Sequence, residues 1–318
     1  MSIVGKVKRN ARFCKELWKN RVSVRAALES ENFIFLTGFP PGHFYSPICD
    51  LCEIRKNAGK VFDRSLITFS ECNINEAGQL RLLGEFAGGF PENPFPDQKK
   101  QTHRYYFDNP FFSYGDGIIL YSVLRHFKPK RVVEVGSGFS SAEMMDVNDL
   151  FFDKQIKFTF IEPFPERLRS LLSEADRGRY SIETTPVQQV ALSVFTLLEA
   201  NDILFVDSSH VAKTNSDVLH ILFNILPLLQ PGVLVHFHDI LWPFEYPRDW
   251  IEGGRAWNEA YFLRAFLQYN GAFEVLFFNS FMALHHAQAI EKTMPAMLKV
   301  PSAKETIGNS SLWLRKGR

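Results

Sequence analysis

One short segment, EVGSGFSS (Glu134 to Ser141), carries the clearest chemical signal in the sequence. It follows an apolar run typical of a strand and opens a run typical of a helix, which is the setting of a nucleotide-type cofactor loop. Gly136 and Gly138 allow the backbone to turn sharply and to approach a ligand that a Cβ atom would obstruct. The segment predicts a cofactor site, although a plain strand-to-helix turn would use the same residues.

Two acidic residues favour S-adenosylmethionine over a dinucleotide at this turn. Glu134 lies two residues before Gly136, where a negative charge disfavours a pyrophosphate and favours sulfonium and ammonium groups. A dinucleotide loop would also use a third glycine, whereas this chain has Ser141 at that position. Glu162 ends the next predicted strand, where a carboxylate can accept hydrogen bonds from both hydroxyls of a ribose. A solvated acid at a strand end is the alternative interpretation of Glu162.

Four segments, in this order and spacing, resemble the successive motifs of class I S-adenosylmethionine-dependent methyltransferases: VVEVGSGFSS, FIEPFP, ILFVDSSHV and PGVLVHFHDI. The resemblance spans about residues 111–318 and is closest to the bacterial branch with macrocin-type sugar O-methyltransferases. It implies a Rossmann-like fold and methyl transfer. It also implies which residues surround the cofactor: Glu134, Gly136, Ser137 and Gly138 at the methionine part, Glu162 at the ribose, Gln188 near the adenine, and Asp207 and Ser208 beside them.

Acids and histidines follow two further predicted strands. Asp207 ends the run ILFVD, His210 follows it closely, and His238 and Asp239 end the run GVLVHFH. Ligands of doubly wound sheets bind outside the carboxyl ends of the strands, so we expect these side chains to share a cleft. Methyl transfer to a hydroxyl requires alignment of the acceptor and removal of its proton. We predict His238 as the base, Asp239 as the group that orients it, and His210 as the second candidate.

Structural roles would also explain parts of this set. His236 and His238 are two residues apart on one strand and point to the same side, as in a hydrogen-bonded polar seam. Ser208 and Ser209 of the DSSH segment could be turn and capping residues, which would leave only Asp207 with a chemical role.

A metal ion at the same strand ends would use Asp207, His238 and Asp239. Metal-dependent relatives carry an acid, followed by Asn or Asp, at the later strand end, where this chain has His238 and Asp239. Mixed nitrogen and oxygen ligands could still bind a divalent ion, but the histidine argues against magnesium.

Two rival functions remain open. One is a non-haem iron oxygenase with His236, His238 and Asp239 as a facial triad, a chemistry usually found in all-β folds. The other is a non-catalytic, cofactor-binding interaction module.

Four cysteines lie in the first quarter of the chain, at Cys14, Cys49, Cys52 and Cys72. This number does not suggest the disulfide scaffold of a secreted protein. A structural zinc site would need Cys14 and Cys72 to converge on the single CxxC pair. We therefore expect ordinary thiols rather than a zinc site.

Alternating strands and helices must position these residues. The predicted strands are RVVEV, KFTFIE, YSIETT, ILFVD, GVLVHFH, FEVLFFN and SLWLRK, and the main predicted helices span residues 117–127, 140–150, 187–198, 216–229 and 255–268. Strands separated by single helices imply right-handed crossovers and a parallel, doubly wound α/β sheet. The last of the seven strands arrives after a long excursion and could insert antiparallel to its neighbour.

A Pro-rich, polar stretch at residues 91–101 suggests a boundary between an N-terminal cap, residues 1–110, and a methyltransferase domain, residues 111–318. The cap begins with a basic amphipathic helix. Docking on the main domain explains its apolar stripe better than an anionic membrane surface does. The aromatic segment 242–266 is typical of a substrate lid, although Trp257, Tyr261 and Phe266 could form a core face. The run 102–116 could close over the cofactor.

Composition bounds the remaining possibilities. The 318 residues are 46% hydrophobic and 22% charged, with a net charge of +1, so charge does not favour nucleic acid as a partner. The sequence has no apolar stretch of membrane-spanning length, and basic residues interrupt the N-terminus before any signal-peptide core could form. We expect a cytoplasmic enzyme that methylates a hydroxyl of a small molecule or glycan. The identity of the acceptor, the choice of oxygen, nitrogen or carbon, and the oligomeric state are not encoded in any pattern that we recognise.

Overall fold

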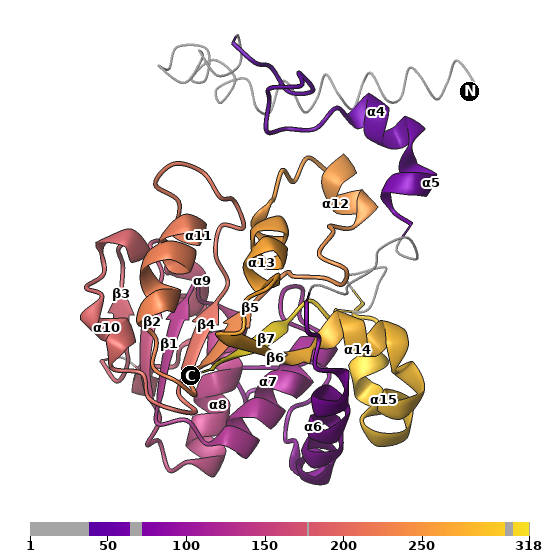
Figure 1. The fold of residues 1–318 in the computed structure, drawn as a ribbon. Coiled ribbons are helices and arrows are strands. Elements are labelled where there is room, and N and C mark those ends of the chain that lie inside the picture. The colour runs from indigo at the N-terminus through magenta and orange to yellow at the C-terminus, as the bar shows by residue number, and fades with distance from the viewer. Residues whose placement is uncertain (1–37, 64–71, 177, 303–307, 318) are drawn as a thin grey trace, which may run out of the picture. The chain divides into compact units, whose positions relative to one another are not determined.

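The structure, a computed structural model, describes residues 38–63, 72–176, 178–302 and 308–317 (Figure 1). The chain divides into two compact units, Met1–Asp63 with Ile251–Ala256 and Arg64–Trp250 with Trp257–Arg318. The candidate site lies in the second unit.

The second unit contains a seven-stranded sheet in the order β3-β2-β1-β4-β5-β7-β6. Its strands are β1 Arg131–Val135, β2 Lys157–Ile161, β3 Ser181–Glu183, β4 Ile203–Val206, β5 Leu234–Phe237, β6 Phe273–Phe278 and β7 Leu312–Lys316. The first five strands are parallel, and β7 is antiparallel to both β5 and β6. The predicted doubly wound α/β class, the seven strands and the antiparallel last strand are confirmed.

Helices cover both faces of this sheet, which explains why β4 and β5 are buried along their whole length. In Figure 1, α7 and α8 lie together on one side of the sheet, and α11 and α13 lie on the other. The helices of this unit are α6 Glu76–Gly89, α7 Tyr114–Phe127, α8 Phe139–Phe151, α9 Glu166–Leu171, α10 Ser193–Thr196, α11 Asp217–His220, α13 Glu259–Leu267, α14 Asn279–His285 and α15 Ala287–Thr293; α12 Arg248–Glu252 extends into the first unit.

Two predicted helices are wrong in detail. Residues 187–198 form a 3-10 turn, Val187–Gln189, and the short helix α10, and a buried apolar side chain anchors each piece. The segment 216–229 begins as α11 but passes into a π-helical turn, Ile221–Ile225, and then a 3-10 turn, Leu226–Leu228. Pro227 cannot donate the backbone hydrogen bond that a regular helix requires, so the last turns are irregular.

The first unit contains α4 Leu51–Lys56 and α5 Ala58–Val61. Asp50 caps α4 by accepting a hydrogen bond from the amide of Cys52 at 2.7 Å. Cys49 and Cys52 are exposed thiols, whereas Cys72, in the second unit, is buried. The predicted N-terminal amphipathic helix and Cys14 lie outside the described residues. None of the described helices is long and apolar enough to cross a membrane.

The predicted cap, residues 1–110, includes α6, which packs against α7 and β6 in the same compact unit as the sheet. The proposed domain boundary at residue 110 stays a prediction.

Candidate functional site

The glycine turn connects β1 to α8 and lies against the end of β4. Gly136 has a φ of +79°, and a Cβ atom there would lie only 1.9 Å from the carbonyl oxygen of Asp207. The amide of Gly136 donates to the carbonyl of Ile161 at 2.9 Å, and the amide of Asp207 donates to the carbonyl of Val135 at 2.8 Å. Only glycine fits at position 136, because the turn is held this close to both neighbouring strands.

Glu134 stabilises the turn from its buried side. It is completely buried, and its two carboxylate oxygens accept hydrogen bonds from the hydroxyls of Ser140, at 2.6 Å, and Ser141. Burial raises the pKa of Glu134 to about 8, although the serine hydroxyls act in the opposite direction. The sequence argument treated Glu134 as a negative charge facing the ligand. The structure instead shows a buried carboxyl group whose oxygens organise the start of α8 and whose pKa is raised by burial.

Glu162 lies beside the same turn, as predicted from its place at the end of β2. Its carboxylate accepts a hydrogen bond from the amide of Ser137 at 3.0 Å and another from the amide of Phe164 at 2.8 Å. The side chain amide of Gln188, in the turn after β3, donates to the carbonyl of Asn215 at 2.7 Å. These contacts place Glu162 at the glycine turn and leave Gln188 in a neighbouring loop.

Four predicted residues meet at the ends of β4 and β5, and we call Asp207, His210, His238 and Asp239 the strand-end cluster. The Nε2 atom of His210 lies 3.4 Å from a carboxylate oxygen of Asp207 and 3.9 Å from one of Asp239. His238 Nε2 lies 3.6 Å from the other oxygen of Asp239. His210 and Asp239 have φ angles of +60° and +54°, a conformation that costs energy for residues other than glycine. The backbone therefore stores strain at this cluster.

Glu259, the first residue of α13, joins the cluster and was missed as a site residue by the sequence analysis. Its side chain is 1% exposed, and its oxygens lie 2.8 Å from His210 Nδ1 and 3.0 Å from the Ser208 hydroxyl that donates to it. An acid in the first turn of a helix is ordinarily a partner of the helix dipole, so the sequence offered no sign of this contact.

The two histidines of the cluster differ in their electrostatic surroundings. Burial lowers the pKa of His210, but the carboxylates of Asp207 and Glu259 prevail and raise it well above its ordinary value. Burial raises the pKa of Asp207, but the facing histidines, His238 and His210, bring it below its ordinary value. The two acids that flank His210 therefore favour its protonated form.

His238 is buried, with 6% of its surface exposed, and its Nδ1 atom has no hydrogen-bond partner among the described residues. Its ring lies 5.2 Å from that of Phe112. His236, by contrast, is completely buried, stacks on Phe205 at 3.7 Å and lies 3.0 Å from the hydroxyl of Ser311. Burial lowers the pKa of His236 well below its ordinary value. The Nδ1 atom of His236 also has no partner among the described residues, so the difference between the two histidines is one of position: His236 packs inside the sheet, whereas His238 faces Asp239.

No group of three or more His, Cys, Asp or Glu side chains within the described residues has the arrangement of a metal site. This statement includes the set Asp207, His238 and Asp239 and the facial triad with His236.

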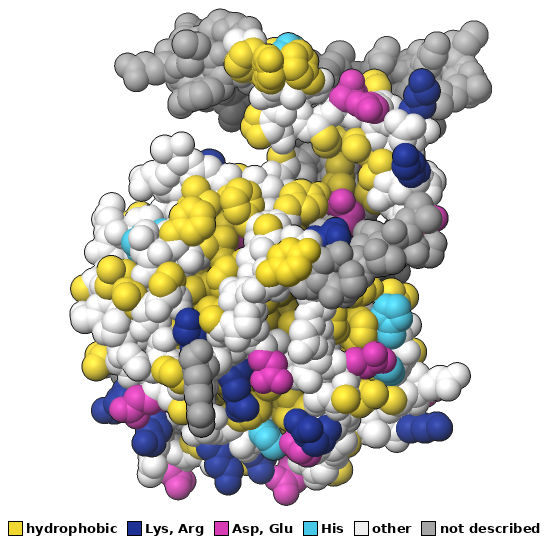
Figure 2. Space-filling model, viewed as in Figure 1, with side chains coloured by type: hydrophobic (Ala, Val, Ile, Leu, Met, Phe, Trp, Pro, Cys, Tyr) yellow, Lys and Arg dark blue, Asp and Glu magenta, His cyan; other side chains and the backbone are white. Residues whose placement is uncertain are grey.

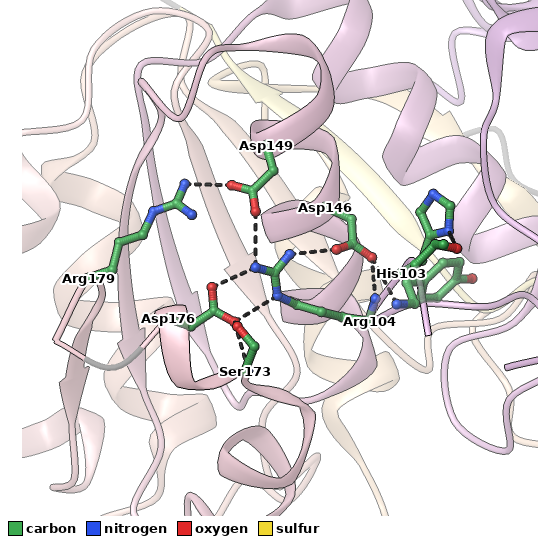
Figure 3. Close-up of polar contacts among 9 residues, drawn as sticks. His103, Arg104, Asp146, Asp149, Ser173, Asp176 and Arg179 are labelled. Atoms are coloured by element: carbon green, nitrogen blue, oxygen red, sulfur yellow. Dashed lines mark hydrogen bonds and ion pairs between the residues drawn. The ribbon is translucent and has the colours of Figure 1, made fainter. Parts of the chain in front are cut away.

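The segment 102–116, predicted to close over the cofactor, is anchored to α8 by Arg104 (Figure 3). The guanidinium of Arg104 contacts Asp146 at 2.6 Å, Asp176 at 2.5 Å and Asp149 at 3.0 Å, and the backbone amide of Arg104 also donates to Asp146. A cavity of about 420 Å³ lies beside these residues, along the second half of α8. The segment then reaches the first residue of α8, Phe139, whose ring lies 5.9 Å from that of Phe111.

The predicted lid, residues 242–266, provides α12 and α13. The core face of α13 is formed by Ala260, Leu263 and Leu267 rather than by Tyr261, which is exposed. Trp257 packs against His210 with ring centroids 4.3 Å apart. In Figure 2, hydrophobic side chains gather over α11 and α13, whereas charged side chains gather at the opposite end of this unit. Phe223, in the π-helical turn after α11, and Phe262, on α13, are exposed.

Comparisons with known proteins find similarity to a methyltransferase family. A family model described as a methyltransferase domain matches residues 133–240. An uncharacterised protein of Archaeoglobus fulgidus is 35% identical over 169 residues, which cover 51% of this chain and 75% of that protein. Among solved structures, the O-methyltransferase TomG of Streptomyces achromogenes, in complex with SAM, is 15% identical, with 83% of this chain and 98% of that chain covered and a TM-score of 0.42. A methyltransferase of Podospora anserina, bound to SAH, is also 15% identical, with coverages of 80% and 99% and a TM-score of 0.39.

Proposed function

Because this chain belongs to the class I S-adenosylmethionine-dependent methyltransferases, we propose that it methylates a hydroxyl group of a small molecule or sugar, with His238 as the base. The single observation that carries the choice of base is the position of His238 directly after β5, where its Nε2 atom lies 3.6 Å from a carboxylate oxygen of Asp239 in the strand-end cluster.

The residues around the glycine turn fit S-adenosylmethionine. Gly136 lets the turn lie against the carbonyl oxygen of Asp207, where no Cβ atom would fit, and Glu162 presents carboxylate oxygens beside this turn for the ribose hydroxyls. The bound cofactor supplies an electrophilic methyl group on its sulfonium. Asp207 adjoins this site through its carbonyl contact with the turn, whereas the hydroxyl of Ser208 is engaged with Glu259.

The proton of an acceptor hydroxyl must leave as the new bond forms, and a neutral imidazole is the group in this cluster that can take it. His210 is unsuited, because the carboxylates of Asp207 and Glu259 favour its protonated form. His238 has a free nitrogen, and Asp239 lies 3.6 Å from its other nitrogen, where it can orient the ring and stabilise the protonated state. His238 therefore serves as base, and His210 serves to hold the acids together.

The acceptor is a small organic molecule in this proposal. Two exposed aromatic side chains, Phe223 in the π-helical turn after α11 and Phe262 on α13, offer contacts for its apolar parts.

The test replaces His238 with Ala and with Asn, and uses His220→Asn, at the C-terminal end of α11, as the control. A panel of phenols, sugars and hydroxy acids is first assayed for release of S-adenosylhomocysteine by the unaltered protein. Loss of a positioned base should then lower turnover about 10²- to 10⁴-fold while the Kd of S-adenosylhomocysteine and the melting temperature stay unchanged. Unaltered turnover per folded molecule in His238→Asn would show that His238 is a packing residue. Loss of activity with EDTA, restored by a divalent ion, would replace the base by a metal.

A further inference from the structure

Arg167, on α9, lies directly against the glycine turn. A Cβ atom at Gly138 would be 3.1 Å from its Cδ atom, so the aliphatic part of the side chain packs on the turn itself. Its guanidinium lies over the ring of Phe111, 4.0 Å from the centroid, and that ring stacks on Phe139 at the start of α8. Two segments that are distant in sequence thus fix this arginine beside the predicted cofactor site.

The donors of Arg167 are not consumed by the protein. Its guanidinium forms no ion pair or hydrogen bond with any residue that the structure describes, whereas Arg104 is bound by three aspartates. Its positive charge is nevertheless felt at the site, since it contributes to lowering the pKa of Asp207, behind the larger effects of burial and of the two histidines. An arginine that is held in place but has unused donors is suited to bind an anionic ligand.

We propose that Arg167 binds the carboxylate of the methionine part of S-adenosylmethionine, and that Phe111 holds the guanidinium in position; this inference rests on the proposed function. The carboxylate is the only anionic group of that cofactor. Its sulfonium and ammonium groups would be repelled by a guanidinium. A guanidinium and a carboxylate form two parallel, charge-assisted hydrogen bonds, which a lysine cannot reproduce.

The decisive comparison uses two ligands that differ only in that carboxylate, S-adenosylhomocysteine and its decarboxylated analogue. Calorimetry is performed on the unaltered protein, Arg167→Ala, Arg167→Lys and the matched control Arg169→Ala, an exposed arginine on the same helix. Arg167→Ala should weaken S-adenosylhomocysteine binding about 10- to 100-fold and leave the analogue unaffected. Arg167→Lys should recover part of the loss, and Arg169→Ala should bind both ligands normally.

Equal weakening of both ligands in Arg167→Ala would show that Arg167 merely shapes the turn and would overturn the proposal, as would equal affinity of the unaltered protein and Arg167→Ala for S-adenosylhomocysteine. Failure of the proposed function looks different. If Arg167→Ala shows the carboxylate-specific loss but the protein never methylates a hydroxyl, the role of Arg167 stands and the proposed acceptor is wrong. If the unaltered protein binds neither ligand, both the role of Arg167 and the proposed function are wrong.

Discussion

The glycine turn and the strand-end cluster lie at the same edge of the sheet but are held in opposite ways. Within the turn, Glu134 and the two serines that it binds belong to one segment of eight consecutive residues, and both carboxylate oxygens have partners. The cluster is assembled from the loops after β4 and β5 and from the start of α13. It contains two residues with positive φ and a buried nitrogen without a partner.

This difference in assembly separates the residues that bind the cofactor from those that act on the acceptor. The turn combines the local contacts of Glu134 with backbone contacts to β2 and β4, so the cofactor site can form once the central strands and α8 have formed. The cluster exists only when α13 is docked, because Glu259 connects it to His210 and Ser208. Strain and unsatisfied polar atoms are typical of places where function, rather than stability, selected the geometry. Substitutions in the cluster should therefore leave cofactor binding unchanged, whereas substitutions in the turn should abolish both cofactor binding and turnover.

The largest expected effect comes from Gly136→Ala. The new Cβ atom would lie 1.9 Å from the carbonyl oxygen of Asp207, on a backbone that disfavours side chains, so the turn must move away from β4. Strain and overpacking together predict a loss of about 4 kcal/mol in the free energy of unfolding and no detectable binding of S-adenosylhomocysteine.

Gly138→Ala is the matched control, because residue 138 has an extended φ of −179° and its Cβ atom would meet only the flexible side chain of Arg167. We expect less than about 1 kcal/mol of destabilisation there. Equal effects at both glycines would mean that the close approach to Asp207 does not fix the turn. Urea unfolding and calorimetry make both measurements.

A smaller effect is expected from Glu259→Gln. The variant keeps an oxygen for Ser208 but removes the charge that faces His210, which should cost about 2 kcal/mol in the free energy of unfolding. Turnover should fall, while the Kd of S-adenosylhomocysteine should stay the same, because the turn does not depend on Glu259. Weakened binding would contradict the separation of the two regions.

Glu259→Gln should also change how the stability of the protein depends on pH. The pKa of His210 is raised in the folded protein, so its stabilising contribution is complete below the ordinary pKa of histidine and is lost as pH rises through the higher, folded value. Removing one carboxylate lowers that folded value. Thermal melts of Glu259→Gln should therefore show the alkaline loss of stability at a lower pH than those of the unaltered protein.

Sequence patterns predicted the parts of the site that are local. The strands are short apolar runs and the turn needs glycine at position 136, so composition and spacing within a few residues determined both. The acids and histidines at the ends of β4 and β5 followed from the rule that these ends share one edge.

The remaining parts depend on distant contacts. Glu259 and Arg167 look like ordinary surface charges on helices, and only the docking of α13 and α9 gives them partners at the site. The burial of Glu134 was missed for a related reason. Its position before the glycines was evident, but periodicity does not reveal that Ser140 and Ser141 turn back to enclose it.

The last prediction concerns that enclosed carboxyl group. The pKa of Glu134 is raised to about 8, above the value of about 4.5 expected in the unfolded chain. The protonated form therefore stabilises the fold fully below pH 4.5, and this contribution is lost as the pH rises from 4.5 through 8. Glu134→Gln cannot titrate but keeps an acceptor oxygen, so at pH 5 it should lie within about 1 kcal/mol of the unaltered protein.

Melting temperature against pH should consequently be flatter between pH 4.5 and 8 in Glu134→Gln than in the unaltered protein. An identical slope would mean that Glu134 ionises normally and that the turn, like the cluster, carries a negative charge. A second measurement identifies what that charge would do. If the ammonium of S-adenosylhomocysteine approaches Glu134 on binding and lowers the pKa of its carboxyl group, a proton passes to the buffer. Calorimetric enthalpies at pH 7 will then depend on the ionisation enthalpy of the buffer, and Glu134→Gln will abolish that dependence. Because the proton is released to the buffer only when the ligand cation reaches the carboxylate, the result decides whether the turn only supports the cofactor or also recognises its charge.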